Sequence, residues 1–148
     1  MELRKLSESF YAQNTHLVEV LDKTNNSWTG GKTRGYGIVV VEVAGLKFGI
    51  PLRSNMNHRF GFITVSSEKK GLDYTKAVLL SKDEYISDAE FAIPTAEYIA
   101  IKDNTDDIAK EFNKFVNKYV RAAKNNDANV LNYYRYSTLK NYHVELGI

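Results

Sequence analysis

A cluster of polar side chains suited to phosphate chemistry follows one strand-like run in the middle of the chain. Within six positions it supplies a cation, a hydroxyl group, two amides and an imidazole, on Arg53, Ser54, Asn55, Asn57 and His58. Such a set, placed on a loop by a rigid strand, is typical of a binding or catalytic site. The alternative is a polar turn in which the Ser and Asn side chains satisfy local backbone groups.

These residue types suit metal-free cleavage of RNA, in which the 2′-hydroxyl of the substrate is the nucleophile. His58 is the candidate for proton transfer, because the pKa of an imidazole lies near neutral, and Arg53 and Arg34 are candidates for binding the phosphate. Ser54 would orient the 2′-hydroxyl or the phosphate, and Tyr36 would stack on a base or bind the RNA backbone. Each residue also has a structural interpretation: Arg34 as a solvated loop charge, Tyr36 as an ordinary strand aromatic and His58 as a turn cap.

The net charge of +2 hides a strong asymmetry along the chain. Residues 23–82 contain ten Lys or Arg and three acidic residues, whereas residues 83–111 contain nine acidic residues and two lysines. A mixed solvated surface would scatter the signs more evenly, so the basic part is predicted to bind a polyanion. The candidates for RNA binding within it are Lys32, Arg34, Asn55, Asn57, Arg59, Lys69 and Lys70. The alternative is that the basic and acidic parts neutralise one another in space.

The sequence indicates neither a metal site nor a cofactor. Its three histidines are far apart and lack the spacing of metal ligands. The pair Asp106-Asp107 lies at a predicted helix start, where acidic residues are expected because of the helix dipole. The stretch from Gly30 to Thr33 looks superficially like a phosphate loop, but it lacks the strand before it and the helix after it. We therefore expect no cofactor and no metal.

Composition predicts a single domain over residues 1–148. The chain is 43% hydrophobic and 26% charged, which is ordinary for a soluble globular protein. It has no cysteine, which excludes disulfides and thiolate metal sites and fits a cytoplasmic location. We expect no membrane partner, because no apolar run approaches the length of a membrane span and the charged first residues do not suit a secretion signal.

Strands are expected to position the candidate site. The β-branched run 36–43 predicts a central strand, and Ala44-Gly45 turns it into a second strand over 46–52. Because Pro51 has no N–H, we expect that second strand to be an edge or to end there. Further strands are predicted over 59–66, 73–80 and 84–86, with a loop over 22–35 and a turn over 68–71.

Helices are expected near both ends of the chain. Ser7 can cap a first helix with Phe10, Leu17 and Leu21 on one side, and Asn104 can cap a long helix near 104–124. A short helical turn over 128–132 and a last helix over 137–145 are also predicted, while 91–101 fits either a strand or a helix. The stretch Tyr133-Tyr134-Arg135-Tyr136 is aromatic and basic like an RNA-binding surface, although we favour packing of a helix on the sheet. Together these elements predict an α+β domain with a mostly antiparallel sheet.

The motifs, in their order, resemble those of the toxins of type III toxin–antitoxin systems, the ToxN/AbiQ superfamily, and in particular its CptN/TenpN-like branch. The resemblance covers nearly the whole chain. The segments that carry it are Lys32-Thr-Arg-Gly-Tyr-Gly37, Ile50-Pro-Leu-Arg-Ser-Asn-Met-Asn-His58, Gly71-Leu-Asp-Tyr-Thr-Lys-Ala-Val78 and Tyr136-Ser-Thr-Leu-Lys-Asn-Tyr-His-Val-Glu-Leu-Gly-Ile148.

This resemblance implies a compact, highly twisted, mostly antiparallel sheet with a barrel-like core similar to Kid and MazF, flanked by helices. It implies a metal-independent, sequence-specific endoribonuclease that leaves 2′,3′-cyclic phosphate ends. The substrates would be its own repetitive antitoxin RNA and also cellular and phage mRNA. Cleavage of these mRNAs would stop growth in abortive infection. The processed antitoxin RNA pseudoknot would inhibit the toxin in an RNA-bridged toxin–RNA hetero-oligomer.

Within ToxN itself the motif looks more like Pro-Leu-Thr-Ser-Pro-Lys, and this chain departs from it with Arg53 at the threonine position and Met56 at the lysine position. The serine of the ToxN motif matches Ser54, and a lysine before the central strand of ToxN corresponds to Arg34. A second lysine of the family is replaced by Met56, which cannot transfer a proton, so that role shifts to His58. The alternative function is a non-catalytic RNA-binding or adaptor protein that uses the basic face of residues 23–82.

Overall fold

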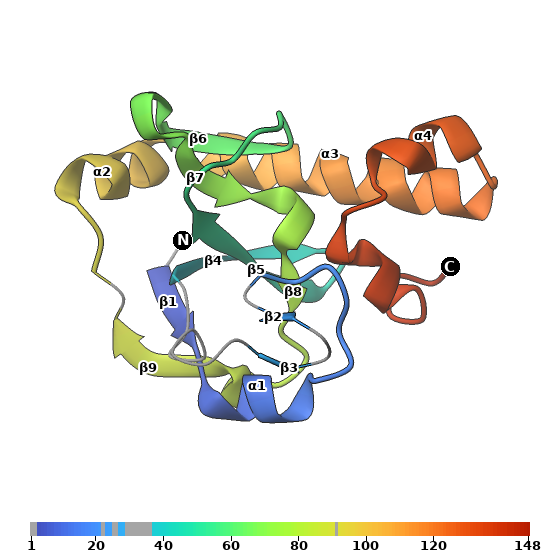
Figure 1. The fold of residues 1–148 in the computed structure, drawn as a ribbon, viewed down its shortest axis with the longest axis horizontal. Helices are drawn as coiled ribbons and strands as arrows, with labels where there is room; N and C mark the ends of the chain where they lie inside the picture. Colours follow the sequence, from blue (N-terminus) through green and yellow to red (C-terminus); the bar gives the residue numbers. More distant parts are fainter. Residues whose placement is uncertain (1–2, 22, 25–26, 29–36, 91) are drawn as a thin grey trace.

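The computed structural model describes residues 3–21, 23–24, 27–28, 37–90 and 92–148 of the chain (Figure 1). Its described part has an α+β fold with a seven-stranded antiparallel sheet, which confirms the predicted fold class. The strands are β1 (Leu3–Leu6), β2 (Lys23–Thr24), β3 (Ser27–Trp28), β4 (Gly37–Val43), β5 (Leu46–Arg53), β6 (Gly61–Val65), β7 (Lys70–Asp73), β8 (Val78–Leu79) and β9 (Ile86–Glu90). The α-helices are α1 (Glu8–Gln13), α2 (Thr95–Asp103), α3 (Thr105–Lys124) and α4 (Ala128–Tyr133).

The strand order in the sheet is β6-β7-β5-β4-β1-β9, with β8 also paired to β5, while β2 and β3 form a separate pair. The central β4–β5 hairpin turns at Ala44 and Gly45, which both have positive φ angles, of 51° and 81°. This is the geometry of a two-residue hairpin turn that matches the twist of its strands. Among the described strands the two edges, β6 and β9, do not pair with each other. The sheet is therefore open, and a barrel-like closure is not confirmed.

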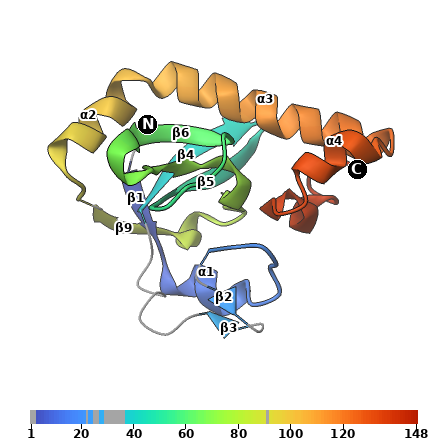
Figure 2. The same ribbon diagram turned by 45° about the horizontal axis from the view of Figure 1, so that its top comes forward.

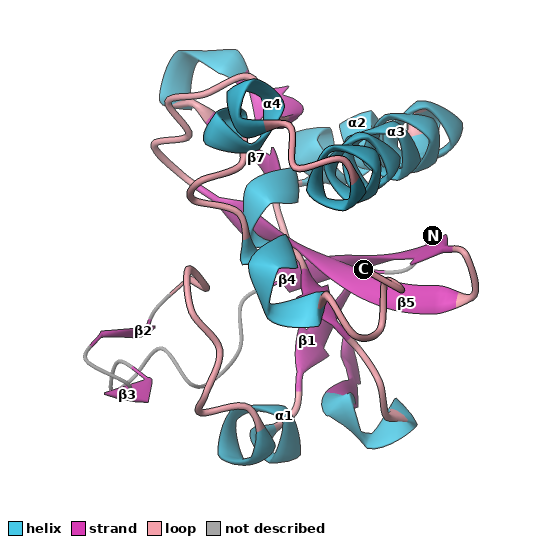
Figure 3. Ribbon diagram, turned by 90° about the vertical axis from the view of Figure 1, so that its right-hand side faces the viewer, coloured by secondary structure: helices cyan, strands magenta, loops and turns pink. Residues whose placement is uncertain are grey.

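The long helix α3 lies along one side of the sheet, and α1 lies on the other side (Figures 2 and 3). The predicted helical repeat is confirmed, because one face of α3 is buried in the core: Ile108, Phe112, Phe115, Val116, Tyr119 and Ala122. Asn104 occupies the position before this helix, but its side chain donates to the carbonyl oxygen of Ala100 instead of capping the helix. Burial of the apolar face is thus what holds α3 on the sheet.

Pro51 lies inside β5, so the expectation that the strand is an edge or ends there is wrong. Residues Phe48 and Gly49 of β5 pair with β8, whereas Leu52 and Arg53 pair with β7. Pro51 lies where the neighbour on this side changes, and a residue without an N–H is tolerated at such a break.

The predicted strand over 73–80 is also wrong, and this error matters most for the site. Strand β7 ends at Asp73, a 3-10 turn (η2, Tyr74–Lys76) follows, and β8 then covers only two residues. The carboxylate of Asp73 accepts a hydrogen bond from the backbone N–H of Thr75, so the side chain replaces a strand partner and turns the chain.

The remaining differences concern the lengths of elements. Ser7 caps α1 as predicted, but this helix ends at Gln13, so Leu17 and Leu21 are not part of it. The predicted last helix is a shorter 3-10 turn (η4, Thr138–Tyr142), and the ambiguous segment 91–101 contains the start of α2 at Thr95. The strand expected over 84–86 is displaced: a 3-10 turn (η3, Asp83–Tyr85) precedes β9. The expected loop 22–35 contains β2 and β3, and the expected strand 59–66 corresponds to β6. The expected turn 68–71 begins at the last residue of a 3-10 turn (η1, Ser66–Glu68) and includes the start of β7.

Candidate functional site

The carboxylate of Asp73 lies at the centre of the candidate site. Its side chain is fully buried, and Oδ2 accepts a hydrogen bond from Nη1 of Arg53 at 3.0 Å. Oδ1 accepts two more, from the backbone N–H and the hydroxyl of Thr75, at 2.9 and 2.6 Å. A buried charge requires such partners, and they fix the carboxylate in one position. Asp73 therefore orients the guanidinium of Arg53, one of the predicted phosphate-binding groups.

Strand pairing brings these two residues together although twenty positions separate them in sequence. Arg53 is the last residue of β5 and lies opposite Gly71 of β7, two residues before Asp73. On its other side Gly71 lies close to β6, because a Cβ atom on Gly71 would lie 2.2 Å from the backbone oxygen of Phe62. The site is thus built where the end of β5 pairs with β7, whose last residue is Asp73.

His58 approaches the same carboxylate from the loop between β5 and β6. Its Nε2 lies 3.1 Å from Oδ1 of Asp73, an ion-pair distance. The ring is not aligned for a directed hydrogen bond, and Nε2 is buried with no other partner in the described part of the chain. Nδ1 accepts a hydrogen bond from the backbone N–H of Phe60 at 3.0 Å. The hydrogen-bond network therefore assigns the proton of a neutral ring to Nε2, on the side of Asp73.

This geometry limits what His58 can do. Both ring nitrogens face protein groups, Phe60 on one side and Asp73 on the other. A substrate can exchange a proton with the imidazole only after the ring turns away from one of them. In this arrangement the neutral ring of His58 holds the loop in place, because a protonated Nδ1 could not accept the hydrogen bond from Phe60.

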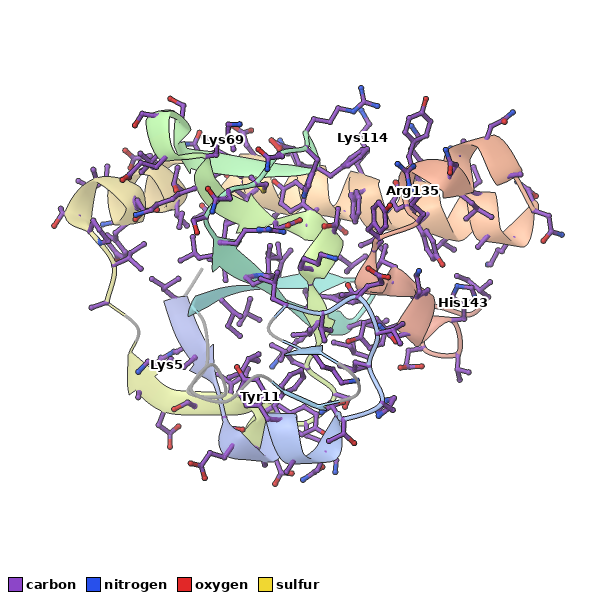
Figure 4. The ribbon with its side chains drawn as sticks, in the orientation of Figure 1. Lys5, Tyr11, Lys69, Lys114, Arg135 and His143 are labelled. Carbon is purple, nitrogen blue, oxygen red and sulfur yellow. The ribbon has the colours of Figure 1, made fainter. Side chains whose placement is uncertain are left out.

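Arg53 and His58 both line an open cavity of about 510 Å³, which we call the cationic cavity. This volume lies within the usual range of ligand sites. The other lining residues include Phe60, Lys76 and Ser137, which were not predicted as site residues, and Tyr133, Arg135 and Tyr136, for which packing was favoured over RNA binding. Arg135 lies just after α4, on the side of the molecule that carries the C-terminal segment (Figure 4).

Lys76 is the most informative of the residues that sequence analysis missed. Its side chain is 15% exposed, and Nζ donates to the carbonyl oxygen of Tyr136 at 2.9 Å and lies 3.6 Å from Oε2 of Glu19. Burial lowers the pKa of Lys76, while the charges of Glu19 and Asp73 oppose this shift. The signal was present in the sequence, because an aspartate two residues before a threonine favours a turn, and this turn places the lysine in the cavity.

The stretch from Tyr133 to Tyr136, which sequence analysis assigned to packing, serves two purposes. Tyr134 is buried and donates from its hydroxyl to the carbonyl oxygen of Phe115 at 2.8 Å. Tyr133 and Tyr136 are 58% and 61% exposed and line the cationic cavity. Aromatic rings at such a position can stack on nucleobases.

The polar residues between Arg53 and His58 do not line this cavity. Ser54 and Asn55 are exposed, and the contact of Arg53 with Ser54 is a hydrogen bond from Nε to the backbone oxygen at 3.2 Å. Asn57 instead accepts a hydrogen bond from Nζ of Lys69 at 2.9 Å. Met56, at the position of the family's lysine, is buried.

The other predicted RNA-binding residues lie around the site or outside the described residues. The guanidinium of Arg59 lies 5.3 Å from the ring centre of Phe60 and 5.8 Å from that of Tyr133. Lys70 lies 3.5 Å from a carboxylate oxygen of Glu68. Lys32, Arg34 and Tyr36 fall in the part of the chain that the structure leaves undescribed.

A larger cavity, of about 880 Å³, is formed by β1, α1 and β9, and Lys5 and Tyr11 are among its lining residues (Figure 4). None of the predicted site residues is part of its lining. In the described ranges no group of three or more His, Asp or Glu side chains is arranged to hold a metal ion. The same ranges contain no helix with the length and apolarity needed to cross a bilayer.

Comparison with known proteins adds no relative to this description. No family model, no curated protein and no solved structure matches the chain. The resemblance to the type III toxins therefore depends on the sequence motifs alone.

The charges of the cationic cavity indicate what it can bind. Arg53, Lys76 and Arg135 line the cavity; Arg53 is paired with Asp73 and Lys76 with Glu19, so the cationic excess of the described lining comes from Arg135. An anion of the size of a phosphodiester is the complementary ligand, because arginines bind phosphate oxygens with parallel hydrogen bonds. Exposed tyrosines beside these cations suit a nucleic acid better than a free phosphate ion.

Proposed function

We propose that the protein is a metal-independent, sequence-specific endoribonuclease, and that it acts as the toxin of a type III toxin–antitoxin system. The observation that carries this proposal is the Arg53–Asp73–His58 cluster, which opens into a cavity with Lys76 and Arg135 on its wall. It supplies phosphate-binding cations and groups capable of proton transfer in one place.

In the proposed reaction the scissile phosphate binds to Arg53, whose orientation Asp73 fixes. The 2′-oxygen of the preceding ribose attacks the phosphorus and gives its proton to a base. The bond from phosphorus to the 5′-oxygen breaks, and this oxygen receives a proton from an acid. The products are a 2′,3′-cyclic phosphate and a free 5′-hydroxyl group.

His58 and Lys76 are the two cavity residues that we assign to the proton transfers. His58 exchanges a proton once its ring turns away from Asp73 or from the N–H of Phe60. Lys76 is suited because burial lowers the pKa of its ammonium group, which makes proton release easier. Lys76 would thus provide the amine that is missing at Met56.

The biological setting follows from the resemblance. The substrates are the repetitive antitoxin RNA together with cellular and phage mRNA, and the processed pseudoknot inhibits the enzyme in an RNA-bridged hetero-oligomer. A fold related to Kid and MazF is part of the same proposal. The exposed Tyr133 and Tyr136 and the cation Arg59 are supporting features, since they suit an RNA strand that lies across the cationic cavity.

The test is cleavage by the purified protein, in the presence of EDTA, of the RNA transcribed from directly upstream of its gene, where the proposal expects a tandem repeat. The expected products carry 2′,3′-cyclic phosphate ends. Products with 3′-hydroxyl ends, or loss of cleavage in EDTA, would contradict the mechanism. His58→Ala is expected to abolish cleavage and spare RNA binding, while His16→Ala, which changes an exposed histidine outside the cavity, leaves both unchanged.

A non-catalytic RNA-binding or adaptor protein is the second candidate. It is favoured by one observation, the engagement of both ring nitrogens of His58 by protein groups. This alternative predicts salt-dependent RNA binding without cleavage by the wild-type protein. Under both functions Arg53→Ala weakens binding, so cleavage by the wild type and its loss in His58→Ala distinguish them.

A further inference from the structure

A second, smaller cavity of about 220 Å³ adjoins the cationic cavity. Phe60 and Tyr133 line both cavities and so form the partition between them. The second cavity is smaller than the usual range of about 300–1,000 Å³ for small-molecule sites. Its size suits one nucleobase and not a whole nucleotide.

The lining of this second cavity is aromatic, with a basic rim. Lys114 and Lys118 are four residues apart on α3 and therefore lie on the same face of the helix. Arg59 contributes a third cation from the chain segment before β6, with its guanidinium over the ring of Tyr133. Figure 4 shows Lys114 at the edge of the molecule, where it can reach an RNA backbone.

One carboxylate lies among these rings and cations. Oε1 of Glu111 accepts a hydrogen bond of 3.0 Å from the hydroxyl of Tyr74, which is itself buried. Burial raises the pKa of Tyr74, and the charge of Glu111 adds to the shift, so the phenol stays protonated and remains a donor. For the other oxygen, Oε2, the described residues provide no partner. Glu111 is thus held in place from one side and open to a ligand on the other.

We propose that the second cavity binds a single guanine of the RNA strand, next to the phosphate in the cationic cavity. The inference rests on the proposed function, since it takes RNA as the ligand. The carboxylate of Glu111 can accept two parallel hydrogen bonds from neighbouring donors, one at Oε2 and one at the second lone pair of Oε1, whose first lone pair accepts from Tyr74. Guanine presents two such donors, N1–H and N2–H, side by side on its Watson–Crick edge. Uracil, adenine and cytosine each present one donor group there, beside at least one acceptor that the carboxylate repels.

The aromatic and basic groups complete this recognition. The ring of Tyr133 is 58% exposed, so a base that enters between the two cavities can stack on it. Lys114 and Lys118 neutralise the phosphates on either side of the base, and this contribution is independent of sequence. Selectivity for guanine therefore depends on Glu111, and general affinity depends on the lysines.

The experiment measures binding separately from cleavage. Short single-stranded RNAs with 2′-O-methyl groups cannot be cleaved, because their 2′-oxygens carry no proton and cannot attack. A labelled uridine hexamer with one central guanosine is compared by fluorescence anisotropy with the same hexamer carrying inosine, adenosine or uridine at that position. Inosine keeps N1–H but lacks the amino group, so it tests the second donor alone.

The wild-type protein is expected to prefer the guanosine hexamer by about 5- to 150-fold over the uridine hexamer, with inosine in between. Glu111→Gln should remove most of this preference and leave the affinity for the uridine hexamer nearly unchanged. Glu145→Gln, which makes the same charge change at an exposed residue outside both cavities, should keep the preference. Thermal unfolding of both variants checks that the fold is intact.

The outcomes separate this inference from the proposed function. Equal binding of all four hexamers by the wild type overturns the guanine site, whether or not the protein cleaves RNA. A guanine preference that survives in Glu111→Gln overturns the role of the carboxylate. A guanine preference that Glu111→Gln removes, in a protein that cleaves no RNA, supports the site and overturns the endoribonuclease.

Discussion

One carboxylate, Asp73, lies behind the lining of the cationic cavity and another, Glu111, lines the neighbouring cavity, and the two differ in almost every respect. Asp73 is fully buried and accepts hydrogen bonds from Arg53 and from two groups of Thr75. Glu111 is on the exposed side of α3 and accepts one hydrogen bond, from Tyr74. Both carboxylates have mainly basic or aromatic neighbours, but only Glu111 has an oxygen that can accept hydrogen bonds from a ligand without losing a protein partner.

This difference separates a carboxylate that organises a site from one that can recognise a ligand. A buried carboxylate with all its partners supplied by the protein cannot bind a substrate without losing them, and such a loss is costly. Its effect reaches the substrate through the cation that it holds, here Arg53. A carboxylate with one fixed and one free oxygen is already oriented, and it gains hydrogen bonds when a donor arrives.

The largest difference between the two carboxylates is expected in stability, and it is tested by replacing each of them in turn. Asp73→Ala should lower the free energy of unfolding by about 1–3 kcal/mol, because it leaves the buried N–H of Thr75 without its acceptor and the partly exposed guanidinium of Arg53 without its counter-charge. Glu111→Gln should change it by no more than about 0.5 kcal/mol, as is usual at the surface. Urea unfolding of both variants measures the difference, and similar losses for the two would contradict the distinction.

A smaller effect is expected from the donor that orients Glu111. Tyr74→Phe should cost about 1 kcal/mol at neutral pH, the typical net value of one hydrogen bond. The pKa of Tyr74 is raised in the folded state, so its contribution is present below pH 10 and is lost as the pH rises further. The stability difference between wild type and variant should therefore shrink above pH 10.

Unfolding curves at several alkaline pH values measure this change. Burial also raises the pKa of Tyr134 to about 12 and that of Tyr142, but both tyrosines are present in the two proteins and their effects cancel in the difference. A stability difference that stays constant through this pH range would show that Tyr74 does not titrate as inferred.

The smallest expected effect is that of Lys76 on the salt dependence of RNA binding, and it tests whether the cationic cavity binds phosphate. Lys76→Met should reduce the salt dependence of RNA affinity by about one unit in the slope of log K against log salt, if the ammonium group contacts a phosphate. Lys102→Met, on α2 in the acidic part of the sequence, is the matched control and should leave the slope unchanged. An equal slope for wild type and Lys76→Met would remove Lys76 from the phosphate site.

The sequence predicts those elements in which a long, regular pattern of apolar residues matches a single type of secondary structure. The apolar repeat of α3 and the β-branched run of β4 are long, so burial of one face or of both decides their structure. Arg53 and His58 could be found for a related reason, since they flank the end of a strand whose position was clear.

The missed residues lie where a side chain overrides the local pattern. The run from Asp73 to Leu80 has the composition of a strand, but the carboxylate of Asp73 takes the N–H of Thr75 and turns the chain. Lys76 enters the cavity only because of this turn. Tyr133 and Tyr136 could not be separated from Tyr134 by sequence, because their exposure depends on how the chain after α4 packs on Phe115.

Phe60 serves both cavities through different atoms. Its backbone N–H holds Nδ1 of His58, and its ring is the partition that the two cavities share. Residues that share a contact in this way do not vary independently, so the cost of a change on one side depends on the state of the other. A substitution of Phe60 changes the ring that lines both cavities and lies 6.0 Å from the ring centre of His58, so we expect its effects to be non-additive with those of changes at His58 and Glu111.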